Sequence, residues 1–306
     1  MISDIPLAGY ASRFWVYHAR FEKVSARIHL AMVHLFDVDQ PQYAAWLRIH
    51  DIDDGWGYFS DWSTIGTPVP LYYAAQCGFY DLVEHLISKY PEKVDAEGGL
   101  NRTPLAAALY GGHFHVAELL YRHGATVNAR GYSQRTLLQG ASWDGHINAV
   151  RWLLNHGADV NAQGDDQLWT PLHEAAYRGN LQVFRMLVEH EADVNIRTGW
   201  GESPLHLAAH ARNHHDHLDV MQLLLDHGVD PNARDNDEST PLHYSSFYKK
   251  PNYESSRGTV EGTRLLLKHG ANIDAVDREG RTPLQIALAH GRQDIVAVLL
   301  EDGAMQ

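Results

Sequence analysis

The chain has 306 residues, with 25 lysines and arginines against 38 aspartates and glutamates, and its formal net charge is −13. A phosphate backbone is bound by clustered basic side chains, and none occur here, so the composition argues against a nucleic-acid partner. A single cysteine, Cys77, excludes an intramolecular disulfide. No leader is evident and no apolar run approaches about 18 residues, so we predict an intracellular, cytoplasmic protein without membrane contact.

The first 36 residues carry one sustained helical pattern. Apolar residues recur there in alternating steps of four and three, the spacing of a helical seam: Tyr10, Phe14, Tyr17, Phe21, Val24, Ile28, Ala31 and Leu35. A second, shorter helix is predicted from Pro41. The pattern fits either a dimerising coiled coil or a helical cap on the chain that follows. Bulky aromatic residues fit coiled-coil holes poorly, so we favour a capping segment over residues 1–62.

The stretch from Trp169 to Asn195 shows the unit from which the rest of the chain is built. Thr170 has the hydroxyl to cap a helix, and Pro171 suits the first helical position. Gly179 can take the left-handed conformation that ends this helix, and a second helix is predicted over residues 181–188. Each helix alone is too short to be stable in water, so the unit must stack on copies of itself.

Equivalents of Pro171 recur along the chain at nearly constant spacing. The steps between them are 34, 33, 34, 33, 37 and 42 residues, at the markers Pro70, Pro104, Leu137, Pro171, Pro204, Pro241 and Pro283. The last two steps are longer because they contain short insertions. A histidine follows the Pro-Leu pair at three of these markers, in His173, His206 and His243.

This pattern resembles the ankyrin repeat in its period and in its Thr-Pro-Leu-His signature. The resemblance implies an all-α solenoid of about seven helix-turn-helix repeats with extended finger loops, thirteen or fourteen short helices in all. It also implies that the histidines brace the turns through hydrogen bonds from ring to backbone. The predicted ankyrin-repeat domain covers residues 63–306, after the N-terminal helical cap. Its repeats are expected near residues 67–100, 101–133, 134–166, 167–199, 200–236, 237–278 and 279–306.

In the ankyrin family the concave face is built from the fingers and from the end of each first helix. The sixth residue after each marker lies there, which predicts a ladder of rings: Tyr110, Trp143, Tyr177, His210 and Phe247. The fingers add aromatic and charged residues nearby: Tyr132, Trp169, Trp200, Arg102, Arg135, Arg178 and Glu202. Aromatic residues and arginine are enriched at interfaces, so we predict a scaffold that binds a protein or peptide partner on this face. The alternative is that the rings only pack on one another and stiffen the fingers.

A second resemblance concerns the N-terminal segment. Residues 6–11 (Pro-Leu-Ala-Gly-Tyr-Ala), Trp15 and residues 44–46 (Ala-Ala-Trp) are similar to the helical segment before the ankyrin array in fungal NACHT-type signalling NTPases. This similarity implies an alternative function, the ligand-sensing arm or a fragment of such an NTPase. No Gly-Lys dipeptide occurs, so the chain itself carries no phosphate-binding P-loop. An in-frame P-loop upstream of Met1 would favour the sensor over a free-standing adaptor.

No catalytic motif is complete, so we predict no enzymatic activity and no cofactor. His173 and Glu174 begin like a zinc-protease motif, but the second histidine is missing. The insertion of repeat 5 gathers four histidines: His210, His214, His215 and His217. Four imidazoles can bind zinc, yet polar surface insertions need no ligand and structural zinc sites have closer ligand pairs. We predict no metal site, and a rise in melting temperature on adding zinc would reveal one.

Two positions depart from the repeat pattern. Glu191 stands where neighbouring repeats have glycine, so a left-handed conformation is predicted there, and Glu191→Gly is expected to stabilise the protein by roughly 1 kcal/mol. The final helix, over residues 295–300, is apolar where a terminal repeat should be polar outside. We expect this end to continue into further repeats or to pair with a second copy, and the oligomeric state stays open.

Overall fold

The computed structural model describes residues 69–98, 103–130, 134–164, 167–210, 215–247 and 257–304. The chain divides into two compact units, residues 1–132 and 133–306. The predicted cap over residues 1–62 lies outside the described residues, as does Tyr132. None of the helices in the described segments is long and apolar enough to span a membrane.

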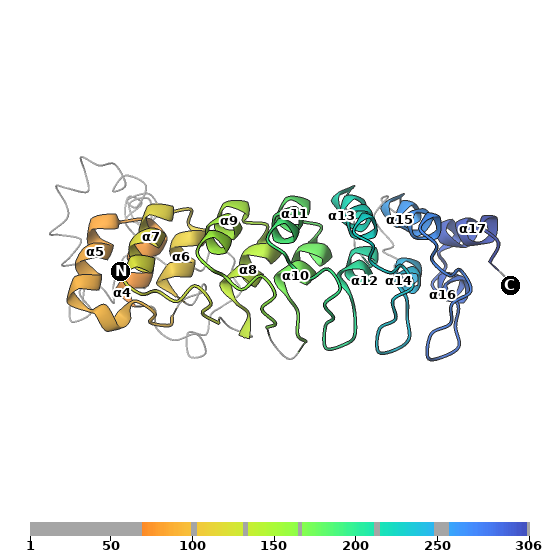
Figure 1. Cartoon of the computed structure of the whole chain (residues 1–306), viewed down its shortest axis with the longest axis horizontal. Helices are drawn as coiled ribbons and strands as arrows, with labels where there is room; N and C mark the ends of the chain where they lie inside the picture. Colours follow the sequence, from red (N-terminus) through yellow and green to blue (C-terminus); the bar gives the residue numbers. More distant parts are fainter. Residues whose placement is uncertain are drawn as a thin grey trace, which may run out of the picture. The chain divides into compact units, whose positions relative to one another are not determined.

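The described part of the unit of residues 1–132 contains two helical hairpins and a short 3-10 helix. Its elements are α4 (Pro70–Cys77), α5 (Tyr80–Lys89), η2 (Pro91–Lys93), α6 (Pro104–Tyr110) and α7 (Phe114–Arg122). Helix α4 packs on α6, and α5 packs on α7, so the two hairpins lie side by side (Figure 1).

The unit of residues 133–306 continues the same plan with five hairpins. Its elements are α8 (Leu137–Asp144), α9 (Ile147–Asn155), α10 (Pro171–Arg178), α11 (Leu181–Glu189), α12 (Pro204–Ala209), α13 (His215–Asp226), α14 (Pro241–Phe247), α15 (Arg257–Lys268), α16 (Pro283–Ala289) and α17 (Gln293–Glu301). The even-numbered inner helices pack in one row and the odd-numbered outer helices in another (Figure 1). We call each loop from an outer helix to the next inner helix a finger.

These helices confirm the predicted fold class. The described residues contain fourteen short α-helices and no β-strand, only isolated bridges such as that between Gly164 and Trp169. The extra residues of repeats 5 and 6 fall between the inner and outer helices, at positions 211–214 and 248–256, outside the described residues.

Threonine caps set where the inner helices begin. The Thr170 hydroxyl accepts a hydrogen bond from the backbone N–H of His173, and Pro171 fills the first helical position. Helix α8 starts with Leu137 instead of proline, yet Thr136 caps it in the same way, through the N–H of Gln139. A cap satisfies an N–H group that has no partner within the helix, whereas proline only removes one, so the cap is sufficient to start a helix.

Glycine ends α10 because the next repeat approaches it closely. Gly179 has a φ of 70°, and a Cβ atom there would lie 2.6 Å from the His217 ring. Glu191 has a φ of 65°, so the prediction of a left-handed residue at this position is confirmed. A side chain in this conformation costs roughly 1 kcal/mol relative to glycine.

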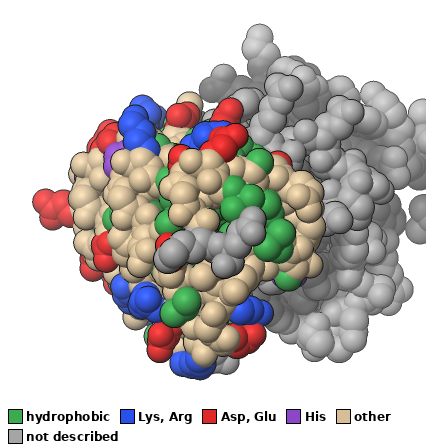
Figure 2. All heavy atoms as spheres, turned by 90° about the vertical axis from the view of Figure 1, so that its right-hand side faces the viewer, with side chains coloured by type: hydrophobic (Ala, Val, Ile, Leu, Met, Phe, Trp, Pro, Cys, Tyr) green, Lys and Arg blue, Asp and Glu red, His purple; other side chains and the backbone are tan. Residues whose placement is uncertain are grey.

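The core lies between the two rows of helices. Its largest fully buried side chains in residues 133–306 are Phe184, Leu138, Leu153, Leu172, Leu187 and Leu205. At the C-terminal end the inner and outer helices leave apolar side chains exposed, with Leu288 of α16 at 51% and Leu300 of α17 at 40% exposure. Figure 2 shows hydrophobic side chains gathered on this end. Continuation into further repeats and pairing with a second copy both stay predictions.

Candidate binding surface

The third residue of an inner helix can hold the base of two fingers, and His206 of α12 shows how. Nδ1 of His206 accepts the N–H of Ser203 at 3.1 Å, and its Nε2–H faces the carbonyl of Ser239 on the next finger at 3.2 Å. This arrangement requires the neutral ring with its proton on Nε2. Burial lowers the pKa of His206 to about 4. The ring-to-backbone bracing implied by the ankyrin resemblance is therefore present.

Repeat 3 makes the same two bonds with an amide. Oε1 of Gln139 accepts the N–H of Thr136 at 2.8 Å, and its Nε2 donates to the carbonyl of Trp169 at 2.7 Å. The corresponding histidines are buried, so burial lowers the pKa of His173 to about 4 and also lowers the pKa of His243. Neutral histidines thus accept the cap N–H groups in repeats 4 to 6, and those of repeats 5 and 6 also reach the next finger through Nε2. Nε2 of His173 is buried without a hydrogen-bond partner in the described residues.

Three predicted aromatic residues meet on repeats 3 and 4. Trp143, near the end of α8, stacks on Tyr177, near the end of α10, with ring centroids 5.7 Å apart. Trp169, in the finger before α10, places its edge against Tyr177 at 5.5 Å. All three side chains are half-buried, so part of each ring is open to solvent. We call these rings, together with Arg135 and Arg178, the aromatic cluster.

The two arginines of the cluster have different roles. Both guanidinium groups lie over the Trp143 ring, that of Arg135 at 5.3 Å and that of Arg178 at 4.8 Å. Arg135 also forms an ion pair at 3.1 Å with Glu174, whose side chain is fully buried. Arg178 is exposed and donates its Nε–H to the carbonyl of Trp143. Within the described residues, the two terminal nitrogen atoms of Arg178 bond to no protein acceptor.

One further apolar residue borders this cluster. Leu168 precedes Trp169, has a φ of 54° and is 42% exposed. Residues at the same place in the fingers of repeats 5 and 7 are glycines, Gly201 and Gly280, with φ of 79° and 74°. A leucine in this conformation is strained. It therefore presents its side chain to solvent at a position that favours glycine.

The remaining predicted residues lie elsewhere. Tyr110 ends α6 and is half-buried in the unit of residues 1–132. Trp200 is 61% exposed at a finger, where its carbonyl accepts the N–H of Asn236. His210 lies against Tyr244, with ring centroids 5.9 Å apart. Phe247 ends α14, and its side chain is outside the described part of the structure.

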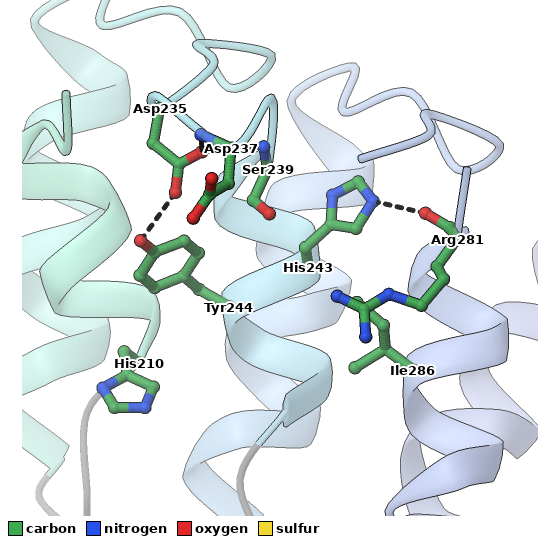
Figure 3. Close-up of a pocket in the computed structure, with 8 residues that line it drawn as sticks. All are labelled: His210, Asp235, Asp237, Ser239, His243, Tyr244, Arg281 and Ile286. Carbon is green, nitrogen blue, oxygen red and sulfur yellow. Dashed lines mark hydrogen bonds between the residues drawn. The ribbon is translucent and has the colours of Figure 1, made fainter. Parts of the chain in front are cut away.

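The sequence did not point to a pocket between the fingers of repeats 6 and 7, which we call the finger pocket. It has a volume of about 310 Å³ and is lined by His210, Asp235, Asp237, Ser239, His243, Tyr244, Arg281 and Ile286. Figure 3 shows Tyr244 pointing toward Asp235, with His243 beside the carbonyl of Arg281. All of these residues belong to the unit of residues 133–306.

Two carboxyl groups share the hydroxyl of Tyr244. Its oxygen lies 2.7 Å from Oδ2 of Asp235 and 2.9 Å from Oε1 of Glu202. One hydroxyl hydrogen can be donated to only one of them, so both contacts are made when Glu202 is protonated and donates to the hydroxyl oxygen. Burial, and then the charge of Asp235, raises the pKa of Glu202. Burial and the two acidic neighbours also raise the pKa of Tyr244.

The arginines around the finger pocket are already paired. The guanidinium of Arg281 lies 2.9 Å from Asp277 and 2.9 Å from Glu279. Arg278 pairs with Asp237 at 3.1 Å. Among the described residues, Asp235 accepts hydrogen bonds only from uncharged N–H and O–H groups, and no lysine or arginine pairs with it. The pocket therefore carries uncompensated negative charge.

The histidine insertion of repeat 5 does not form a metal site within the described residues. His217 is buried and places Nε2 3.1 Å from the carbonyl of Tyr177, against the turn at Gly179. It therefore braces α10. His214 lies outside the described residues, and the described residues hold no group of three histidine, cysteine or acidic side chains placed to bind a metal ion.

Stacked helical hairpins whose fingers are braced by threonine and histidine define the class of ankyrin-repeat proteins. The chain matches the family described as "Ankyrin repeats (3 copies)" at residues 71–164, 145–198, 172–254 and 252–305, and it belongs to this family. It is also 31% identical over 130 residues to the "Azaphilone pigments biosynthesis cluster protein L" of Monascus ruber. That alignment covers 39% of this chain and 27% of the relative, so the chain matches about a quarter of the relative's length.

Proposed function

We propose that this chain is a non-enzymatic scaffold that binds a protein or peptide segment on the face formed by its fingers and inner helices. Ankyrin repeats generally mediate protein–protein interaction, and the ankyrin resemblance implies that this is the concave face. The observation that carries the proposal is the aromatic cluster, in which half-exposed rings and an exposed arginine lie together.

The chemistry of the cluster suits the anchor of an interface. Buried or half-buried tryptophan, tyrosine and arginine residues supply most of the binding energy at protein interfaces. The Arg178 guanidinium is held over Trp143 and by its carbonyl, so little side-chain entropy is lost when a ligand binds it. Its two terminal nitrogen atoms form a fork that matches a carboxylate. We infer that the bound segment places an apolar side chain on the rings and an acidic group on Arg178.

Leu168 supports a binding site at the aromatic cluster. Gln134 and Glu238 have the same conformation in other fingers, so Leu168 is distinguished by its exposed apolar side chain next to Trp169. Glycine would relieve the strain but would remove an apolar side chain from beside Trp169. A leucine retained there extends the apolar surface that a partner would cover.

A random-peptide display library selected against the full chain tests this proposal. We expect enriched peptides whose binding is lost in the double variant Trp143→Ala/Tyr177→Ala. The matched control is Trp152→Ala, because Trp152 belongs to the same repeat but lies on the outer helix α9, stacked on His156 at 3.8 Å.

Two results would contradict the proposal. Peptides that bind the double variant as well as the wild type would place the site elsewhere. A double variant that unfolds well below the wild-type midpoint would mean that the rings mainly stabilise the fold. In that case the exposed Arg178→Met variant, measured against the same peptides, decides whether the cluster takes part in binding.

The alternative function is that of a ligand-sensing arm of a NACHT-type NTPase, either in one chain or as a separate one. It is motivated by the N-terminal similarity alone, over residues outside the described part of the structure. Sequencing of the transcript upstream of Met1 tests it, since an in-frame P-loop would favour the sensor and its absence would leave the adaptor.

A further inference from the structure

We propose that the finger pocket receives a basic side chain, an arginine or a lysine, of the segment that binds this face. This inference rests on the proposed function, because it gives the chemistry of a second contact on the same face. His210 connects the two sites, since it follows α12 at the ladder position and also lines the pocket.

Charge selects a cation. Glu202 and Asp235 face each other across one hydroxyl group, and among the described residues neither has a lysine or arginine partner. Asp237 at the rim is 70% exposed, and its ion-pair partner Arg278 is also exposed. A guanidinium or ammonium group can neutralise the carboxylates of Asp235 and Asp237, whereas an anionic ligand would be repelled by both.

The arginine in the pocket wall does not reverse this preference. Each nitrogen atom of the Arg281 guanidinium is engaged, Nε and one terminal nitrogen by Asp277 and the other terminal nitrogen by Glu279. The group therefore contributes one positive charge beside two negative ones. An incoming carboxylate could reach only the two remaining N–H groups of a guanidinium whose charge is already balanced by Asp277 and Glu279.

The size and walls of the pocket suit one side chain. A volume of about 310 Å³ is at the lower end of the range for ligand sites, roughly 300–1,000 Å³. Tyr244 presents an aromatic ring beside the carboxylates, and cations are attracted to such rings. Ile286 supplies apolar surface for the aliphatic part of a lysine or arginine.

The proposal is tested by NMR titration of the isotope-labelled full chain with N-acetyl-arginine amide and N-acetyl-lysine amide. The uncharged analogue N-acetyl-citrulline amide is the matched control ligand. We expect saturable shifts of the backbone amides of residues 235–239, 243 and 244 with the two cations, and none with citrulline. Absence of saturable shifts, or equal binding of citrulline, would overturn the proposal.

Two variants locate the charge. Asp237→Asn removes a carboxylate and leaves Arg278 unpaired at the rim, so we expect binding at least about tenfold weaker. Glu301→Gln is the control, because Glu301 is a similarly exposed carboxylate paired with an arginine, Arg264, on the outer helices. Equal affinity of Asp237→Asn and wild type would contradict the proposal. Should Asp237→Asn disturb the finger, Asp235→Asn gives the same test. Its remaining side-chain oxygen can still accept the N–H groups of Asp237 and Ser239.

The titration separates this inference from the proposed function. A single amino-acid amide needs no contact with the aromatic cluster, so Trp143→Ala/Tyr177→Ala should bind it with wild-type affinity. A positive titration with failed peptide selection would support the pocket alone. Selected peptides without a required basic residue, together with a negative titration, would leave the aromatic cluster as the only contact.

Discussion

The fingers of repeats 3 and 4 and those of repeats 5 to 7 have the same backbone plan and opposite chemistry. The first group presents rings and guanidinium groups around Trp143, with Arg178 open to solvent. The second presents carboxylates around Tyr244, with its arginines already paired. The capping threonine or serine, the third residue of the helix and the left-handed residue two places before the cap recur in these fingers. The other side chains are free to differ, and the surface therefore carries separate sites.

The two regions also differ in how the finger base responds to acid. Gln139 stays neutral at every pH, whereas His173 and His206 must be neutral to accept a backbone N–H, and burial lowers the pKa of each to about 4. Their ordinary pKa is about 6.5, so the unfolded chain binds more protons between pH 6.5 and pH 4. The stability that depends on these rings is full above pH 6.5 and is lost as the pH falls through this window.

The largest expected effect follows from replacing both histidines, in His173→Gln/His206→Gln. Glutamine makes the same two bonds in repeat 3, so the free energy of unfolding at pH 7 should change little. At pH 4 the variant should be more stable than the wild type by about 3 kcal/mol for each histidine. Urea unfolding at pH 7, 5 and 4 measures this.

Protonation of Glu202 changes the free energy of unfolding with the opposite sign, in the wild type and in the variant alike. Its pKa is raised in the folded state, so its contribution grows as the pH falls and cancels in the comparison of variant with wild type. Equal acid sensitivity of the two proteins would show that these histidines are not buried in the neutral form.

The second prediction separates the two arginines of the aromatic cluster. Arg135→Met leaves the fully buried Glu174 without its cation and should lower the free energy of unfolding by roughly 3 kcal/mol. Arg178→Met should change it by less than about 0.5 kcal/mol, because Arg178 is exposed. Thermal unfolding of each variant at pH 7 measures the difference.

A rescue experiment strengthens this test. Adding Glu174→Gln to Arg135→Met removes the unpaired charge and should restore most of the lost stability. If Arg178→Met were the more destabilising change, or if Glu174→Gln gave no rescue, the assignment of Arg135 to structure and Arg178 to binding would be wrong.

The smallest effect concerns two left-handed residues, one beside the aromatic cluster and one away from it. Leu168→Gly and Glu191→Gly should each stabilise the protein by roughly 1 kcal/mol, seen as a higher melting midpoint. Leu168→Gly should in addition weaken binding of the selected peptides, whereas Glu191→Gly should leave it unchanged. Equal binding by both variants would remove Leu168 from the proposed surface.

The sequence determined the fold because ankyrin signals are local. Thr170, Pro171 and Gly179 each act within one turn of the chain, and the near-constant period repeats that instruction. The left-handed conformation of Glu191 was predictable for the same reason, since its neighbours in phase are glycines. The same position in the finger, at Leu168, was not recognised, because two of the five described repeats there have glycine and three do not.

Part of the aromatic cluster could also be anticipated from the sequence. Trp143 and Tyr177 share one register position in successive repeats, and packed helices bring such positions together. The different roles of Arg135 and Arg178 could not be anticipated, because they depend on an ion pair between Arg135 and the buried Glu174.

The finger pocket was decided by tertiary structure alone. Tyr244 and Glu202 lie 42 residues apart, and they meet because the finger before α12 packs beside α14. Asp235 recurs in phase as Asp277, where it accepts backbone N–H groups of its own finger, so its sequence position indicates a bracing role. That its second oxygen shares a hydroxyl with another carboxyl group depends on distances between repeats, which no local pattern specifies.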